Sequence, residues 1–331
     1  MTELVATTPG IFPLPDWAKD ELSDLKGHQK SDLVSGDEGE AITAAYDEVR
    51  AELIETQQDA GLDRIVEGQG RWDDNLAHPL AVHDNVETRG IVRYYDNNNF
   101  YRDPVVTGPL TESGDVAGEL DATAAQTDGL QAVLPGPYTL AELATDEQYG
   151  DEAAFLDAIA EFLAGEAAAF PDHETLFLLE PSLVTDAPGD GRDAQASEAI
   201  DTVAAAVDSE VVVHPFYGAV DEKVYAHLMD ADVDAIGFDL VSDHDANVYN
   251  AQEYGTKSGV ALGVVDGQNT LVEDPATVRE RFDWFDEQIP AEAFETAYLT
   301  SNTELFYLPV NKAVAKMETL ATAADLEEVE A

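Results

Sequence analysis

Eight short apolar runs recur along the chain, and this rhythm constrains the fold more than any other feature of the sequence. Each run is too short for a helix, and helix-like stretches separate the runs. Parallel strands buried on both faces read as near-continuous Val, Ile and Leu runs, with helices as their crossovers. The sequence therefore predicts an α/β fold, a single (β/α)8 TIM barrel. The predicted strands are Leu4–Ala6, Arg64–Glu67, Gln131–Leu134, Thr175–Glu180, Glu210–His214, Asp234–Asp239, Val260–Asp266 and Thr296–Thr300.

Polar residues stand where most of these runs end. In barrels of this kind the C-terminal ends of the strands meet at one mouth, where the chemistry takes place. The side chains expected to converge there are Gln69, Glu180, His214, Asp239, Asp266 and Asn302. His214 is the first candidate because imidazole can serve as acid, base or ligand near neutral pH. The alternative is a histidine hydrogen-bonded to Asp239 or Glu180.

The charge balance is extreme, with 69 Asp and Glu against 16 Lys and Arg and a formal net charge of −53. Such self-repulsion destabilises a compact state unless counterions screen it, and at molar salt the Debye length falls to about 3 Å. We therefore expect a halophilic protein from a salt-rich cytosol. A hydrophobic content of 44% is ample for a core and argues against a disordered acidic chain. The few basic residues form no stripe, so nucleic-acid binding is not expected.

Cysteine is absent, which excludes a disulfide framework, a thiolate nucleophile and Cys-ligated metal. No apolar run is long enough to span a bilayer, and residues 1–15 lack a basic and apolar leader, so we expect a cytoplasmic protein without membrane contact. The 331 residues exceed a typical barrel of about 250 by enough for insertions within one domain, 1–331. A β-hairpin is predicted at about 89–109, between strands two and three, and an acidic tail at about 322–331.

Several motifs, in order and across essentially the whole chain, resemble the catalytic barrel of the cobalamin-independent methionine synthase family. They are Thr8–Pro13, Ala60–Asp63, Gly68–Asp74, Leu134–Leu140, Glu180–Leu183, Val213–Tyr217 and Leu262–Asp266. The resemblance implies methyl transfer toward homocysteine in methionine biosynthesis, with methyl-tetrahydrofolate or an archaeal methyl-pterin as the donor. The pterin contacts it suggests are Gly10, Gln69, Trp72, Tyr138, Asp266 and Asn302, and the catalytic residues are His214, Asp239 and Glu180.

The zinc site of that family is largely replaced in this sequence. The resemblance places the family's His at His214, its paired Cys at Phe216, its Glu at Asp239 and its last Cys near Leu305. A catalytic zinc needs about three protein ligands. Only a rebuilt set of His214, Asp239 and Glu304 could supply them here.

The homocysteine contacts have also changed. Ile11 stands in place of a Ser, Gln69 in place of a Glu and Leu179 in place of an Asp that would hold the ammonium and carboxylate of the amino acid. Burying a ligand charge without a partner costs several kcal/mol. The usual binding pose of homocysteine is therefore not expected.

Three functions fit these changes. In the first, the chain is a methyltransferase component that works with a separate zinc-bearing paralogue, since long members of the family contain two barrels of which only the C-terminal one carries zinc. In the second, it is a self-sufficient, metal-free enzyme similar to uroporphyrinogen decarboxylase, for which Arg71, Arg93, Arg102 and His214 are the candidate cations. In the third, it is a non-catalytic binding protein.

Overall fold

The computed structural model describes residues 2–22, 39–72, 76–92, 101–289 and 294–326. Its main sheet has eight parallel strands in the order β2, β5, β7, β8, β9, β10, β11 and β1. Their bounds are β1 (Glu3–Ala6), β2 (Ile65–Val66), β5 (Leu130–Pro135), β7 (Thr175–Leu179), β8 (Glu210–His214), β9 (Ala235–Asp239), β10 (Gly259–Val265) and β11 (Thr296–Ser301). All eight predicted strands are present.

The sheet curls until its two edge strands meet. The backbone N–H groups of Asp63 and Arg64, just before β2, both donate to the carbonyl of Ala6 at the end of β1. The Asp63 carboxylate also accepts from the Ala6 N–H, at 2.8 Å. These contacts bring the first and last strands of the sheet together, as a TIM-like barrel requires.

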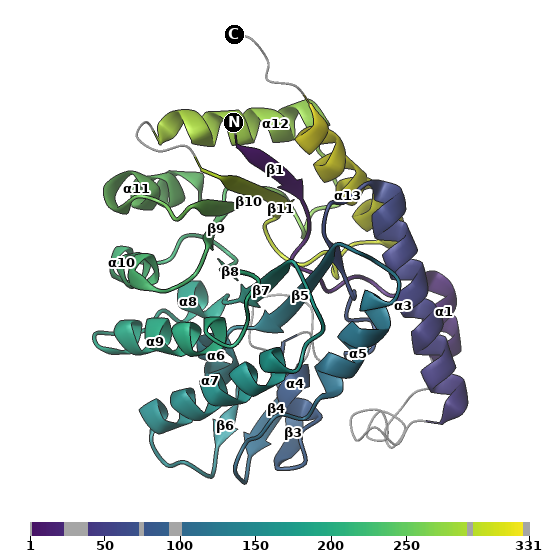
Figure 1. Ribbon diagram of the computed structural model, residues 1–331, viewed down its shortest axis with the longest axis vertical. Coiled ribbons are helices and arrows are strands. Elements are labelled where there is room, and N and C mark those ends of the chain that lie inside the picture. Colours follow the sequence, from purple (N-terminus) through teal and green to yellow (C-terminus); the bar gives the residue numbers. More distant parts are fainter. Residues whose placement is uncertain (1, 23–38, 73–75, 93–100, 290–293, 327–331) are drawn as a thin grey trace.

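Helices surround this sheet (Figure 1). They are α1 (Asp16–Glu21), α3 (Glu40–Ala60), α4 (His78–Ala81), α5 (Asp115–Ala124), α6 (Pro137–Leu143), α7 (Glu152–Ala168), α8 (Ser182–Thr185), α9 (Arg192–Ala204), α10 (Glu222–Asp230), α11 (His244–Tyr254), α12 (Pro275–Gln288) and α13 (Val310–Asp325). At the end of α3, Gly61 adopts φ 84°, a left-handed conformation that a C-cap glycine tolerates. At the start of α7, the Asp151 side chain accepts from the N–H groups of Ala153 and Ala154.

A small second sheet lies at one side of the barrel (Figure 1). Its first two strands fall between β2 and β5 in the chain, and its third follows α6. β3 (Val86–Val92) pairs antiparallel with β4 (Tyr101–Val106), and β4 pairs parallel with β6 (Thr145–Asp146). This is the region of the predicted hairpin, whose connection at 93–100 lies outside the described residues. Of the predicted acidic tail, the part up to Asp325 belongs to α13 and the part from 327 lies outside the described residues.

The core fills the barrel and the space between its strands and helices. Inside the barrel Phe177 and Tyr298 meet edge to face, with ring centroids 5.8 Å apart. Leu176 on β7, Val212 on β8 and Leu262 on β10 are fully buried. Burial of each side chain of this size contributes about 1.5–3 kcal/mol to the stability of the fold. Even a short apolar run therefore gains enough from burial to hold its place as a strand. Among the described residues, no helix combines the length and the apolar character needed to span a membrane.

Candidate functional site

The strands deliver the predicted site residues to one end of the barrel. His214 and Asp239 are the last residues of β8 and β9, while Glu180, Asp266 and Asn302 each follow the end of a strand by one residue. Because all eight strands run parallel, these ends form a common mouth. The mouth has two sides, defined by their strands: the β2–β7 side holds Gln69, Tyr138 and Glu180, and the β8–β11 side holds His214, Asp239, Asn302 and Glu304.

His214 is fully buried at the end of β8 and keeps one nitrogen without a partner. Its Nε2 lies 3.3 Å from the carbonyl oxygen of Ser301. Burial lowers the pKa of His214 to about 4, so the ring is neutral at pH 7, and its proton sits on Nε2, where the Ser301 carbonyl can accept it. Nδ1 is then an acceptor, and it is buried with no hydrogen-bond partner. The predicted alternative, a histidine hydrogen-bonded to Asp239 or Glu180, is wrong because Ser301 takes that place.

Asp239 ends β9, the strand next to that of His214, and is equally buried. Its Oδ1 accepts from the backbone N–H groups of Val241 and Ser242 and from the side-chain amide of Asn302. Its Oδ2 is buried with no hydrogen-bond partner. Burial raises the pKa of the Asp239 carboxyl, and hydrogen bonding from Ser242, Asn302 and Val241 opposes that rise.

Glu180 on the β2–β7 side has a protein donor on each of its carboxylate oxygens. Its two carboxylate oxygens accept from the backbone N–H groups of Tyr138 (3.0 Å) and Thr139 (2.7 Å), the first turn of α6. Gly136 is needed here, since a Cβ at that position would lie 2.1 Å from the Glu180 Cδ. Burial raises the pKa of Glu180 to about 7 against these donors. Glu180 therefore caps α6 from the end of β7.

Gln69 is likewise occupied by an internal contact. Its Oε1 accepts from the Ile11 N–H at 2.7 Å and leaves no room for a Cβ on Gly10, which would lie 2.7 Å away. Ile11 and Gln69 both have positive φ, 57° and 53°, which is uncommon for residues with a side chain. Sequence reasoning missed this strain, which Tyr217 after β8 shares with φ 69°. The preceding glycines at 10 and 68 indicate a turn, but they do not indicate that the next residue is strained.

The aromatic candidates also have protein partners. Trp72 stacks on His78, with ring centroids 5.2 Å apart and planes 11° from parallel. The Tyr138 hydroxyl donates to the carbonyl of Asp186 at 2.7 Å, and the Arg192 guanidinium lies over its ring. Both rings thus pack against protein groups, whether or not a pterin also contacts them. Asp266 lies on the rim, where its carboxylate accepts from the Gln268 N–H at 2.9 Å.

Arg71, one of the candidate cations for a decarboxylase, forms an ion pair. Its Nη1 lies 2.8 Å from Asp115, whose other oxygen lies 3.1 Å from the His78 Nε2. Hydrogen bonding and charge from His78 and Arg71 outweigh burial and lower the pKa of Asp115 to about 2. Arg93 and the Arg102 side chain lie outside the described residues. The predicted cation cluster of a decarboxylase is therefore not assembled among the residues that the structure describes.

Glu67, at the end of β2, belongs to a buried charged cluster that sequence reasoning missed. Arg50 on α3 lies 3.5 Å from Glu67 and also pairs with Glu119. Burial raises the pKa of Glu67 to about 8, and the negative charge of Glu119 adds to the rise. A signal was available, because a predicted strand ended on a carboxylate, and a buried carboxylate needs a partner.

The residues present do not fit the zinc site that the family resemblance implies. In the described part of the chain, no three His, Asp or Glu side chains gather closely enough to hold a metal ion. The predicted set of His214, Asp239 and Glu304 is thus not brought together. Glu304 is buried, with Oε1 accepting from the Tyr307 hydroxyl at 3.0 Å and Oε2 without a partner.

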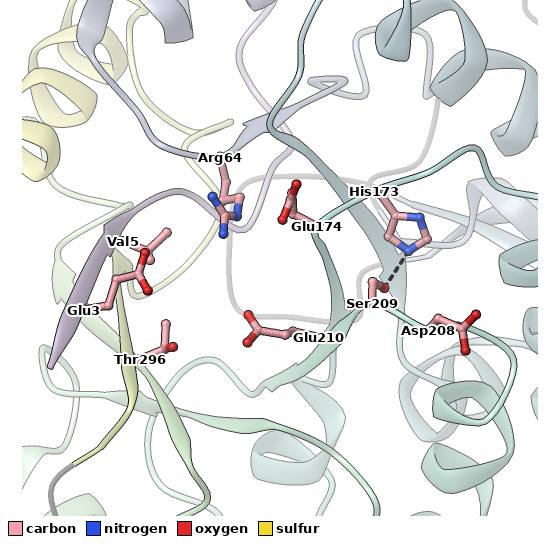
Figure 2. A pocket seen from close by; sticks show the side chains of 9 residues that line it. All are labelled: Glu3, Val5, Arg64, His173, Glu174, Asp208, Ser209, Glu210 and Thr296. Atoms are coloured by element: carbon pink, nitrogen blue, oxygen red, sulfur yellow. Dashed lines mark hydrogen bonds between the residues drawn. The ribbon is translucent and has the colours of Figure 1, made fainter.

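The opposite end of the barrel carries a pocket of about 370 Å³ with a different character (Figure 2). Glu3, Glu174 and Glu210 surround the Arg64 side chain there, and the Ser209 hydroxyl lies 2.8 Å from the His173 Nε2. These residues stand at or before the N-terminal ends of strands. No predicted site residue lies among them, and in barrels this face serves stability.

Comparisons with known proteins bear on the family and the fold of this chain. A family model described as "Cobalamin-independent synthase, N-terminal domain" matches residues 82–289. A methionine synthase of Sulfolobus acidocaldarius is 24% identical over 288 residues, which are 85% of this chain and 80% of that protein. One of Saccharolobus solfataricus is 24% identical over 285 residues, with 82% and 79% covered.

Solved structures show the same fold at low identity. A B12-independent methionine synthase from Shewanella sp. W3-18-1, in complex with selenomethionine, has a TM-score of 0.79 at 18% identity, covering 98% of this chain and 97% of that one. A putative vitamin-B12-independent methionine synthase from Listeria monocytogenes has a TM-score of 0.69 at 16% identity, with 98% of each chain covered.

Proposed function

Because the chain belongs to the cobalamin-independent methionine synthase family, we propose that it is a methyltransferase component of methionine biosynthesis. The observation that carries this is the match of residues 82–289 to the family's N-terminal domain, together with similarity to methionine synthases over most of the chain. The reaction is transfer of a methyl group from a methyl-tetrahydrofolate or methyl-pterin to the sulfur of homocysteine.

We propose that a separate zinc-bearing paralogue supplies the metal. Zinc serves such a reaction by lowering the pKa of a bound thiol so that the thiolate forms at neutral pH. This chain has no cysteine and no cluster of three His, Asp or Glu ligands in its described part. What its own residues offer is a mouth with buried acceptors, which can bind and orient a substrate without activating its sulfur.

The test is methyl transfer in reconstituted mixtures in molar KCl. The chain, the cysteine-bearing paralogue and both together are each supplied with methyl-tetrahydrofolate or a methyl-tetrahydropterin and homocysteine. Methionine is expected to form fastest in the mixture, and the two proteins are expected to co-elute in gel filtration. Full activity of the paralogue alone, or of this chain alone, contradicts the proposed partnership.

A further inference from the structure

The Asp239 carboxylate presents only one of its oxygens to a ligand. Oδ1 takes three donors, the N–H of Val241 at 3.1 Å, the N–H of Ser242 at 2.8 Å and the Asn302 Nδ2 at 3.1 Å. A carboxylate oxygen has about two lone-pair sites, so Oδ1 has no acceptor capacity left. Oδ2 has no partner. Any ligand contact to this carboxylate therefore goes through Oδ2 alone.

Asn302 is held so firmly that its amide has one orientation. Its Oδ1 accepts from the Gly267 N–H at 2.9 Å, which leaves the NH2 group facing Asp239. Its backbone N–H donates to the Val265 carbonyl at 2.8 Å. Gly263 makes space for it, since a Cβ there would lie 2.7 Å from the Asn302 Cα. The β10–β11 pair thus fixes Asn302, and Asn302 fixes Asp239.

The free oxygen belongs to the inner face of the barrel mouth. Side chains alternate along a strand, so Gly237 and Asp239 of β9 project to the same side. That side holds the His214 ring, because a Cβ on Gly237 would lie 2.3 Å from the His214 Nδ1. Asp239 and His214 therefore border the same space, and each brings an acceptor without a donor.

No cation among the described residues pairs with the Asp239 carboxylate. Asp239 takes part in no ion pair among the described residues, and the donors that oppose its burial are uncharged backbone, Ser242 and Asn302 groups. A buried carboxylate without a cation is costly, and a cationic ligand group would relieve that cost. A single free oxygen suits a single donor such as an ammonium. It does not suit the paired donors of an aminopyrimidine edge, which need both oxygens.

We infer that Asn302 is a positioning residue that holds Asp239 so that its Oδ2 accepts a hydrogen bond from the ammonium group of an amino-acid ligand. This inference rests on the proposed function for the nature of that ligand, an amino acid bearing a thioether or thiol. It assigns the ammonium to a position other than the replaced contacts at Ile11 and Leu179.

The experiment compares two probes that differ by the amino group alone, L-methionine and 4-(methylthio)butanoic acid, by calorimetric titration in molar KCl. The wild type is expected to bind L-methionine at least about tenfold more tightly, as a charge-assisted hydrogen bond provides. Asp239→Asn and Asn302→Ala are each expected to remove most of this preference while leaving the affinity for the deaminated probe unchanged. The ratio of the two affinities reports on the ammonium contact alone. If Asn302 were purely structural, Asn302→Ala would leave that ratio unchanged.

The matched control is Asn250→Ala. Asn250 is a buried asparagine of α11 whose side chain donates to the Val220 carbonyl at 2.8 Å. It is expected to lose stability like Asn302→Ala and to keep the preference for L-methionine. Equal affinities of the wild type for both probes, or an unchanged preference in Asn302→Ala, overturn the inference. If the inference fails in this way but the wild type and its paralogue still transfer methyl groups, the proposed function stands. If methyl transfer is absent as well, both the inference and the proposed function are refuted.

Discussion

The two sides of the barrel mouth use the same kinds of side chain for opposite purposes. On the β2–β7 side, Glu180 accepts hydrogen bonds from the backbone of α6, and Gln69 accepts one from the backbone N–H of Ile11, which follows β1. On the β8–β11 side, His214, Asp239 and Glu304 each keep a buried acceptor unpaired. Buried polar atoms without partners cost free energy, so their gathering on one side marks that side as the place for a ligand.

The largest expected effect is on the β2–β7 side. Glu180→Ala leaves the N–H groups of Tyr138 and Thr139 buried without acceptors and opens a cavity. We expect a loss of about 4 kcal/mol in the free energy of unfolding, measured by denaturant titration in molar KCl. A loss below about 1 kcal/mol would mean that α6 does not depend on this cap.

The second prediction uses the pH dependence of the open side. The pKa of His214 falls from 6.5 to about 4 on folding, so the unfolded chain binds the proton more readily between these values. The contribution of His214 to the free energy of unfolding is therefore fully present above pH 6.5. About 3 kcal/mol of it is lost as the pH falls toward 4. His214→Gln should lack this part of the pH dependence. Parallel stability curves for wild type and variant from pH 4 to 7 would contradict the neutral, buried imidazole.

A third, smaller effect is expected for Gln69 on the β2–β7 side. Gln69→Leu conserves volume but deprives the buried Ile11 N–H of its acceptor. We expect a loss of about 2 kcal/mol, the cost of a buried donor without a partner. Thermal and denaturant unfolding of the variant against wild type measures it. An unchanged midpoint would show that water or another group satisfies Ile11.

The smallest effect is expected for Glu304→Gln on the open side. The amide oxygen can still accept from the Tyr307 hydroxyl, and the substitution removes a buried charge that has no cation among the described residues. We expect a change within about 0.5 kcal/mol, or a slight stabilisation. A loss as large as that of Gln69→Leu would remove the contrast between the two sides.

The sequence was sufficient for the strands because each buried strand is a local run of apolar residues. The run ending at His214 marks both β8 and the mouth, and the same holds for Asp239 on β9. The hydrogen-bond partners could not be predicted from the sequence, because these bonds join distant parts of the chain. Glu180 meets the turn at Tyr138, and Asn302 meets Asp239, through contacts set by barrel closure and strand register. Whether a buried acceptor has a donor or lacks one thus depends on tertiary structure.

The most direct test of this account is a crystal structure of the chain with L-methionine, grown in high salt. The account predicts the ligand on the β8–β11 side, with its amino nitrogen within hydrogen-bonding distance of the Asp239 Oδ2, and Glu180 and Gln69 unmoved. Ligand density on the β2–β7 side, with Glu180 or Gln69 released from its backbone partners to bind it, would contradict the account.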